Sequence, residues 1–410
     1  MIGAIADDVT GGTDVAVALR RGGLRTLLFF GVPPAGTTLP AHDAVVVALK
    51  SRMASPQQAV AMSLEALEWL RNNKVSQVYV KYCSTFDSTA EGNIGPVLDA
   101  LSSALSVDVV VTTPSSPRHG RTQYRGHLFI GDGLLAESPM REHPVTPMRD
   151  SNLVRLLQAQ TRTPVGLIGH DTVREGATAV RGVLERPAAR YLLADATTDE
   201  DLLVLGRVLA GAPLVAGAAG LASGLAAAAG SSQASGPDVL PAGRSAALSG
   251  SCSARTLDQV AEVLRRGRPA HRLDPVAVPD PAALAARALA WFDAADADGA
   301  LIYSSMPPED LHRTQEVLGV QRSARVLERA TGLIAAGLVR RGVRRLVAAG
   351  GETSGAVVAA LGVRGGVVGA EAAPGVPWIH PVDPAHPALL LKSGNFGEPD
   401  LLAVATEPAR

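Results

Sequence analysis

The sequence predicts an α/β protein of two domains, each a mostly parallel β-sheet flanked by helices, with a cleft between the domains. Three observations support this fold class. The chain has 410 residues, which is long for one hydrophobic core and favours two domains. Short apolar runs alternate with amphipathic helical patterns, and such alternation is typical of parallel sheets. Residues 230–237 are rich in Gly, Ser and Pro, a composition that suits a connector between domains.

The first domain is expected to span residues 1–229. Apolar runs predict strands at 2–6, 26–30, 44–49, 77–81 and 107–111. Amphipathic patterns predict helices at 13–21, 55–71 and 92–105. A loop-rich stretch at about 113–150 then interrupts the alternation, which resumes with strands at 165–168, 190–194 and 214–216.

A linker is expected at residues 230–244, followed by a second α/β domain at 245–410. Its strands are predicted at 246–248, 300–303, 345–348 and 388–392. Helices are predicted at 255–265, 281–294 and 323–341. The same alternation therefore predicts a second, mostly parallel sheet.

The composition excludes several classes of function. The net charge is −1, so no overall field attracts nucleic acid or an anionic membrane, and neither is expected as a partner. The only two cysteines, Cys83 and Cys252, form neither a disulfide framework nor a multi-cysteine zinc site. Together with the absence of a pattern typical of a secretory signal, this predicts a cytoplasmic protein.

One segment is long and apolar enough to resemble a membrane span. Residues 208–230 carry no charged side chain, and a stretch of this length can cross a bilayer. However, it contains Pro213, five glycines and many alanines. We therefore expect a buried strand that turns into a helix of small residues.

Two adjacent carboxylates follow the first predicted strand. Ligands bind beyond the carboxyl ends of the strands in open parallel sheets, and this strand runs into Asp7 and Asp8, then into a Gly-rich turn at a helix start. A carboxylate in this position can accept a proton from a substrate hydroxyl or bind other hydroxyls. Helix capping by Thr10, Thr13 or Asp14 is the alternative, but capping does not require both aspartates. Asp7 and Asp8 are the candidate catalytic residues.

A second strand end carries a dense polar run. Lys81 closes the strand at 77–81 and leads into a segment that includes Ser84 and Asp87. The chain has only four lysines among 38 Lys and Arg residues, and an ammonium group here suits an anionic substrate. A snorkelling lysine is the alternative. Cys83 has no evident His or Asp partner nearby, which favours a buried or site-lining thiol over a nucleophile.

The loop-rich stretch at about 113–150 contributes one candidate substrate-binding residue and no candidate metal site. Arg121 can bind both oxygens of a carboxylate, and long ordered loops in compact domains are often functional. Lys81, Ser84, Asp87 and Arg121 are therefore the candidate substrate-binding residues. His127 and His143 lie sixteen residues apart, which matches no metal-binding spacing, and no metal-ligating residue is assigned.

Three strand ends of the second domain carry small, hydroxyl-rich turns, which suit phosphate because backbone N–H groups can surround it. The candidate residues of these turns are Ser251, Gly350, Gly351, Glu352, Thr353 and Gly394. Simple capping and tight strand-to-helix turns are the alternatives. No G-x-x-x-x-G-K-[ST] sequence occurs, and no clean G-x-G-x-x-G follows the first strand of either half. A Walker A loop and a Rossmann dinucleotide site are thus disfavoured.

The order of these blocks resembles the four-carbon acid sugar kinase family. The resemblance rests on three blocks: the stretch from Asp7 to Asp14, KYCSTFDST from Lys81, and GGETSG from Gly350. KYCSTFDST with the following EGNIGPV is similar to the block in members that act on 3-oxo-tetronate. The resemblance covers nearly the whole chain.

The resemblance implies a sugar-acid-binding N-terminal domain and a nucleotide-binding C-terminal domain. It implies that ATP, with Mg²⁺, phosphorylates the C4 hydroxyl of 3-oxo-tetronate. ATP contacts would fall on Ser251, the residues from Gly350 to Thr353, and Gly394, and substrate contacts around Asp7, Asp8, Lys81 and Arg121. One departure matters: where the family often has a Gly-Ser pair, this chain has Ala218 and Ala219, so a serine hydroxyl is lost.

Several alternatives stay open. A threonate or erythronate kinase of the same family is the nearest, and a non-catalytic sugar-acid-binding protein or a dehydrogenase belongs to another class. The residues do not decide between Asp7 and Asp8 as the base. Nor do they give the C2 stereochemistry of the substrate or the oligomeric state, although helices of small residues would suit a homodimer interface.

Overall fold

The structure is a computed structural model that describes residues 1–143, 145–230, 239–296 and 298–407. The chain divides into two compact units, Met1–Ser235 and Gly236–Arg410, which are described separately here. Most of the predicted linker, residues 231–238, lies outside the described residues.

The N-terminal unit is built on a sheet of eight strands, all paired in parallel. Because helices cover both faces of such a sheet, its strands are apolar on both sides, and all five residues of β3 are buried. In spatial order the strands are β2 (Thr26–Phe30), β3 (Ala44–Ala48), β1 (Ile2–Ala6), β4 (Gln77–Lys81), β11 (Leu214–Gly217), β5 (Val110–Thr113), β10 (Tyr191–Ala194) and β9 (Val165–Ile168).

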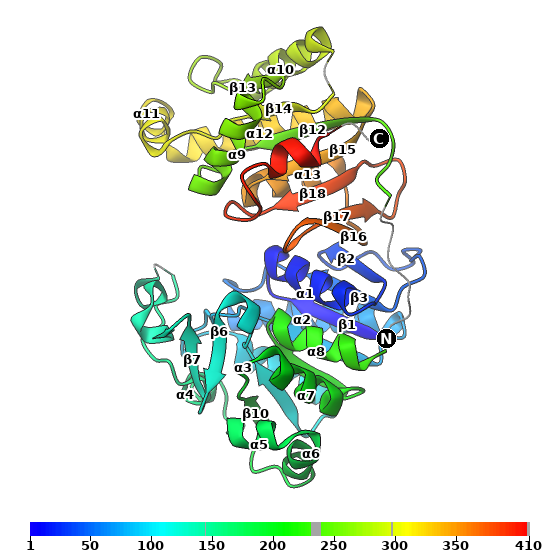
Figure 1. The fold of residues 1–410 in the computed structure, drawn as a ribbon, viewed down its shortest axis with the longest axis vertical. Helices are drawn as coiled ribbons and strands as arrows, with labels where there is room; N and C mark the ends of the chain where they lie inside the picture. Colours follow the sequence, from blue (N-terminus) through cyan, green and yellow to red (C-terminus); the bar gives the residue numbers. More distant parts are fainter. Residues whose placement is uncertain (144, 231–238, 297, 408–410) are drawn as a thin grey trace. The chain divides into compact units, whose positions relative to one another are not determined.

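The helices of this unit lie in two layers (Figure 1), with α1, α8 and α7 on one face of the sheet. The helices are α1 (Val9–Arg21), α2 (Pro56–Asn72), α3 (Ile94–Ala104), α4 (Leu153–Gln158), α5 (His170–Glu175), α6 (Ala177–Glu185), α7 (Asp199–Leu209) and α8 (Ala219–Ala228). Helices α7 and α8 approach so closely that a Cβ atom at Gly206 would lie 2.1 Å from the backbone of Gly224. Only glycine permits this contact, which fixes α8 against α7.

The stretch expected to be a loop holds a small antiparallel sheet instead. Strands β6 (Arg121–Tyr124), β7 (His127–Ile130) and β8 (Gly133–Leu134) pair in sequence order. Short 3₁₀ helices, η1 (Pro117–His119), η2 (Leu135–Glu137) and η3 (Pro139–Glu142), flank it. The strands are only two to four residues long and partly exposed, so their apolar pattern is too short to predict a sheet.

The C-terminal unit has a seven-stranded sheet whose first five strands are parallel. In spatial order they are β13 (Ala270–Arg272), β14 (Ala300–Tyr303), β12 (Arg244–Ser249), β15 (Val343–Ala349) and β18 (Ala388–Lys392). Two antiparallel strands follow, β17 (Val376–Pro381) and β16 (Gly365–Ala373).

Helices cover both faces of this second sheet (Figure 1). One core brings α9 and the short α14 against β12, β15 and β18, whereas α12 packs with α10 and α13. The helices are α9 (Ala254–Arg265), α10 (Pro281–Ala295), α11 (Pro308–Leu318), α12 (Val320–Arg340), α13 (Gly351–Leu361) and α14 (Leu401–Ala405).

The predicted fold class is confirmed, and several boundaries are corrected. The strand expected at 107–111 is β5, Val110–Thr113, because Ser106 adopts a φ of 53° and Val107 N–H bonds Ser102 O, which closes the end of α3. The helix expected from Thr13 begins at Val9. The apolar segment at 208–230 contains β11 and α8 as expected. Among the described residues, no helix has both the length and the apolar character needed to cross a bilayer.

Candidate functional site

The carboxyl ends of three neighbouring strands meet in the N-terminal unit. Strand β1 lies between β3 and β4, with Ala6 opposite both Ala48 and Lys81. Here the strand order switches direction, which is where open α/β sheets bind ligands. Asp7 N–H bonds Lys81 O at 3.0 Å, and Asp7 O accepts from Arg52 N–H at 3.1 Å. The backbone therefore joins the segments that carry Asp7, Arg52 and Lys81.

Arg52 binds both predicted aspartates. Its Nε and Nη2 donate to the two carboxylate oxygens of Asp7 at 2.8 Å each. Nη2 also lies 2.8 Å from Asp8 Oδ1, and Nη1 lies 3.9 Å from Asp87 Oδ2. Burial opposes the charge on Arg52, but the hydrogen bond and charge of Asp7, with Cys83 and Asp8 nearby, raise the pKa of Arg52 further above its usual value. Arg52 is thus a permanent cation that neutralises this group of carboxylates.

Asp8 also caps helix α1. Its Oδ1 accepts the Gly11 N–H at 2.7 Å, and its backbone is extended, as an N-cap requires. The capping role that the sequence left to Thr10, Thr13 or Asp14 therefore belongs to Asp8. The same oxygen contacts both the helix N-terminus and Arg52, which holds this carboxylate in one orientation.

A pocket of about 110 Å³ opens at these strand ends. The sequence-predicted residues Asp8, Lys81 and Ser84 line it. The other lining residues are Thr10, Gly11, Asp14, Arg52, Cys83, Ser116, His119, Ala218 and Ala219. Both signs of charge and several hydroxyl groups therefore face one small space, which can bind a polar anion.

Asp14 and Lys81 carry opposite charges in this pocket. Asp14 is half-buried, and Lys81 is buried. Burial raises the pKa of Asp14, and Asp8 adds to the rise, whereas Lys81, His119 and Arg52 lower it. Lys81 is 4% exposed, and its Nζ donates to Tyr82 O at 2.7 Å. The pocket thus contains a carboxyl group that is more basic than an ordinary aspartate.

The N-terminus of helix α8 also reaches the pocket. Its N-cap, Ala218, supplies no side-chain hydrogen bond, and Ala218 and Ala219 both line the cavity. The serine that the family resemblance leads one to expect is therefore absent at a position facing this space. Only backbone groups are available there.

Two predicted substrate-binding residues lie outside the pocket wall. Asp87 bonds the Thr146 hydroxyl and lies 3.9 Å from His143 Nδ1, and Arg121 donates to the carbonyl of His119. Asp87 follows Phe86, and both have positive φ angles, 49° and 63°. Such backbone is strained for residues other than glycine and is often found at functional sites.

In the C-terminal unit, the predicted turns follow adjacent strands β12, β15 and β18. Ser251 N–H bonds Ala349 O at 3.2 Å, and Gly350 N–H bonds Lys392 O at 2.9 Å. Gly350 has a φ of 123°, a conformation that side chains disfavour, and it precedes the first turn of α13 without a side-chain cap. The three turns therefore converge because their strands are neighbours.

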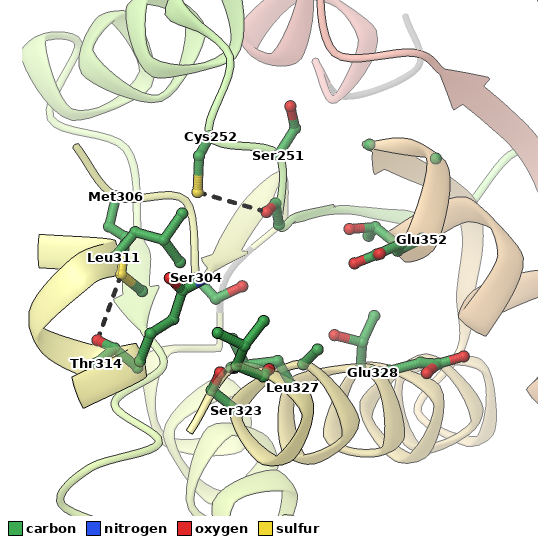
Figure 2. A pocket seen from close by; sticks show the side chains of 18 residues that line it. Ser251, Cys252, Ser304, Met306, Leu311, Thr314, Ser323, Leu327, Glu328 and Glu352 are labelled. Carbon is green, nitrogen blue, oxygen red and sulfur yellow. Dashed lines mark hydrogen bonds between the residues drawn. The ribbon is translucent and has the colours of Figure 1, made fainter. Parts of the chain in front are cut away.

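Five of the six predicted ATP-binding residues line one pocket of about 420 Å³: Ser251, Gly350, Gly351, Glu352 and Thr353. Figure 2 shows Met306 and Leu311 toward one end and the carboxylates of Glu328 and Glu352 toward the other. Ligand pockets of this size commonly combine an apolar wall with a few polar groups. The pocket can hold a nucleoside with its phosphates near the glycine turn.

The sixth residue, Gly394, lies beside this pocket. A Cβ atom on Gly394 would lie 2.6 Å from Ser251 Oγ. Its carbonyl oxygen is surrounded by Ser253 Oγ, Thr256 Oγ1 and Lys392 Nζ at 2.7, 2.8 and 3.0 Å. We call these three groups the Gly394 carbonyl clamp. Because the peptide is trans, the N–H of Asn395 points away from the clamp.

Lys392 is the charged member of the clamp. It is 2% exposed, and no carboxylate lies within ion-pair distance among the described residues. Burial, with Arg255 nearby, lowers the pKa of Lys392 to about 8. Lys392 is the last residue of β18 and is not among the candidate residues taken from the sequence.

Arg52, Asp14 and His119 are the charged or titratable pocket residues that were not identified as site residues from the sequence. Arg52 is one of many arginines and follows a strand without a distinctive motif. Asp14 was weighed only as a cap, although its position one helical turn beyond Thr10 places both on the same face of α1. His119 lies in η1, within the stretch expected to be an irregular loop.

Comparison with known proteins identifies both units. A sequence model described as a sugar-binding N-terminal domain matches residues 2–225, and one described as a nucleotide-binding C-terminal domain matches residues 246–402. A curated protein from Cupriavidus necator, named 3-oxo-tetronate kinase, is 48% identical over 98% of this chain and 95% of its own length. One of the same name from Pseudomonas fluorescens is 47% identical, covering 99% and 96%.

A solved structure agrees with the fold over the full length. The crystal structure of a Salmonella typhimurium LT2 protein, described provisionally as a tRNA synthase, shares 42% identity and a TM-score of 0.92, with 98% of both chains covered. That description concerns the Salmonella protein, and the curated relative from the same strain is named 3-oxo-tetronate kinase. The chain therefore belongs to the four-carbon acid sugar kinase family.

Proposed function

We propose that this chain is an ATP-dependent kinase that phosphorylates the C4 hydroxyl of 3-oxo-tetronate to give 3-oxo-tetronate 4-phosphate. The observation that carries the proposal is the near-complete alignment, at 48% and 47% identity, with two curated proteins of that name. The two pockets support it, because one combines cations with hydroxyl-binding groups and the other combines an apolar wall with a glycine turn.

In the N-terminal unit, Lys81 supplies positive charge for the substrate carboxylate, beside Arg52, whose charge is shared with Asp7 and Asp8. Asp8 and Ser84 face the same space and can accept or donate hydrogen bonds to the sugar hydroxyls. Asp7 acts through Arg52, because both of its carboxylate oxygens bind that guanidinium. Asp87 and Arg121 remain predicted substrate contacts. Because they lie outside the pocket wall, they would contact only a ligand that extends beyond the pocket, or they would support the residues that form the wall.

In the C-terminal unit, Ser251 and the turn from Gly350 to Thr353 would bind ATP, with Gly394 beside them. The carboxylates of Glu328 and Glu352 have no hydrogen bond or ion pair among the described residues, and oxygen ligands of this kind suit Mg²⁺. When bound, Mg²⁺ supplies positive charge to the phosphates. Transfer requires the γ-phosphoryl group to meet the C4 hydroxyl, so closure of the domains stays a prediction.

An ATP-consumption assay on 3-oxo-tetronate, threonate and erythronate tests the proposal. We expect kcat/KM for 3-oxo-tetronate to exceed the other two values by at least about a hundredfold, since a site built for one polar group rejects its analogues. Phosphorus–proton NMR of the product should place the phosphate on C4. Preference for threonate or erythronate would establish the alternative kinase, and tight sugar-acid binding without ATP turnover would establish a binding protein.

A further inference from the structure

Asp8 and Asp14 line the pocket of the N-terminal unit, and Asp7 precedes Asp8 in the chain. Of these three aspartates, Asp14 alone makes no hydrogen bond or ion pair with the residues that the structure describes. Asp7 uses both oxygens to bind Arg52 at 2.8 Å. Asp8 uses Oδ1 for the Gly11 N–H at 2.7 Å and for Arg52 at 2.8 Å. Carboxylate oxygens that already accept hydrogen bonds from the protein are less available to a substrate hydroxyl.

Asp14 has different surroundings. It lies on α1, lines the pocket and has no hydrogen bond or ion pair with any residue that the structure describes. The charged or titratable groups facing it come from every element around the pocket. They are Asp8 at the start of α1, Arg52 after β3, Lys81 on β4, Cys83 after β4 and His119 in η1.

These neighbours give Asp14 the properties that a base needs. Burial and Asp8 raise its pKa, which makes the carboxylate a better proton acceptor. Lys81, His119 and Arg52 oppose the rise, so they favour the ionised form that the reaction requires. Asp8 and Arg52, by contrast, already neutralise one another.

We propose that Asp14 is the catalytic base that accepts the proton of the C4 hydroxyl. This rests on the function proposed above. The C4 oxygen forms a bond to the γ-phosphorus of ATP while the bond between that phosphorus and the β–γ bridging oxygen breaks. The hydroxyl proton passes to an Asp14 carboxylate oxygen, ADP leaves with the bridging electron pair, and Asp14 releases the proton to solvent.

The assignment separates the three carboxylates by role. Asp14 moves a proton, Asp8 orients the ligand and caps α1, and Asp7 positions Arg52. Loss of a general base typically lowers turnover by about 10²- to 10⁴-fold. Loss of an orienting or positioning group instead changes KM, stability or both.

The test measures kcat, KM and the pH profile of Asp14→Asn, Asp8→Asn and Asp7→Asn in the full chain. Wild-type turnover of 3-oxo-tetronate is established first, so that failure of the proposed function is recognised separately. We expect Asp14→Asn to lower kcat by about 10²-fold or more. It should keep the Kd for ATP and the KM for the sugar acid within about threefold, and it should lose the acidic limb of the kcat profile. Asp8→Asn and Asp7→Asn should retain that limb.

The variant Asp14→Glu and a measurement of stability distinguish loss of the base from loss of the fold. A glutamate restores the carboxylate at a shifted position, so we expect partial recovery of kcat relative to Asp14→Asn. Asp14→Asn should unfold at the same urea concentration as wild type or higher, because the asparagine avoids burying a charge. Turnover of Asp14→Asn within threefold of wild type would overturn the proposal. Loss of the acidic limb in Asp8→Asn or Asp7→Asn, with its retention in Asp14→Asn, would do the same.

Discussion

The carboxyl edges of the two sheets both form a candidate anion-binding site, but they use different chemical groups. Each presents a nearly fully buried lysine as the last residue of a strand. Lys81 ends β4 and is 4% exposed, and Lys392 ends β18 and is 2% exposed. Lys81 shares its pocket with Asp8, Asp14 and Arg52, so ionic side chains dominate. Lys392 has Arg255 as its charged neighbour and contacts hydroxyl and carbonyl oxygen atoms.

The two edges therefore differ in the groups that they arrange to bind an anion. In the N-terminal unit, charges are arranged by salt bridges between side chains, and the pocket depends on Arg52. In the C-terminal unit, glycine turns and helix N-termini arrange backbone N–H groups, and side chains fix that backbone. Side-chain ion pairs suit a small ligand with several polar groups, whereas backbone N–H groups suit phosphates.

Replacing Arg52 should produce the largest effect and confine it to the N-terminal unit. Arg52→Met leaves Asp7 and Asp8 partly buried without their cation, and we expect the free energy of unfolding to fall by about 3–5 kcal/mol. The Arg52 and Asp7 side chains are 20% and 17% exposed. Urea denaturation measures the loss, and calorimetric titration should give an unchanged Kd for ATP in the protein that remains folded.

The matched control for Arg52 is Arg155→Met in the same unit. Arg155 also pairs with an aspartate, Asp150, but its side chain is 63% exposed. Because water screens an exposed pair, we expect Arg155→Met to lower the free energy of unfolding much less than Arg52→Met does. Equal losses in the two variants would show that the Arg52 network is no more important than a surface ion pair.

Lys392 should make stability depend on alkaline pH. Its pKa in the folded protein, about 8, lies below the ordinary value of 10.5, so folding disfavours its charged form. This cost is fully present below pH 8 and disappears as the pH rises from 8 to 10.5. The free energy of unfolding of wild type, relative to Lys392→Met, should therefore rise over that interval by up to about 3 kcal/mol.

Urea titrations at several pH values between 7 and 10.5 measure this difference. Lys50→Met, which removes an exposed ammonium group, is the control. A wild-type to Lys392→Met difference that does not change with pH would contradict the buried, unpaired state of Lys392. The electrostatic environments of Lys81 and Lys392 would then differ less than the structure indicates.

Gly350→Ala should have the smallest effect on stability and a specific effect on nucleotide binding. At a φ of 123° a side chain is strained, and its Cβ would lie 3.1 Å from Ser251 Cβ. We expect a loss of about 1–2 kcal/mol in stability and about a tenfold weaker Kd for ATP, with sugar-acid binding unchanged. That tenfold change corresponds to about 1.4 kcal/mol.

Gly355→Ala is the control for Gly350→Ala. Gly355 lies in the same helix, α13, is exposed and has open space where a Cβ would be placed. Alanine should leave ATP binding unchanged and stabilise the helix by up to about 1 kcal/mol. Matching losses of ATP affinity in the two variants would show that the turn conformation of Gly350 is not what binds the phosphates.

The sequence predicted the elements that depend on apolar periodicity and strand ends. Asp8, Lys81 and Ser84 meet in one pocket because their strands are neighbours, and Ser251 and Gly350 meet for the same reason. The contacts of Arg52 and Asp14 were not predictable, because they depend on which loop folds over which strand end. The start of α1 was misplaced because Gly11 and Gly12 resemble a turn, whereas Asp8 caps the helix before them.

The Gly394 carbonyl clamp determines when the Gly394–Asn395 peptide becomes ordered. Ser253, Thr256 and Lys392 fix the Gly394–Asn395 peptide plane within the folded unit itself. The conformational entropy of that peptide is therefore lost during folding, and none remains to be lost when a nucleotide arrives. A preorganised peptide of this kind keeps its dipole in place, so a ligand bound beside Gly394 would meet the same electrostatic environment before and after a reaction.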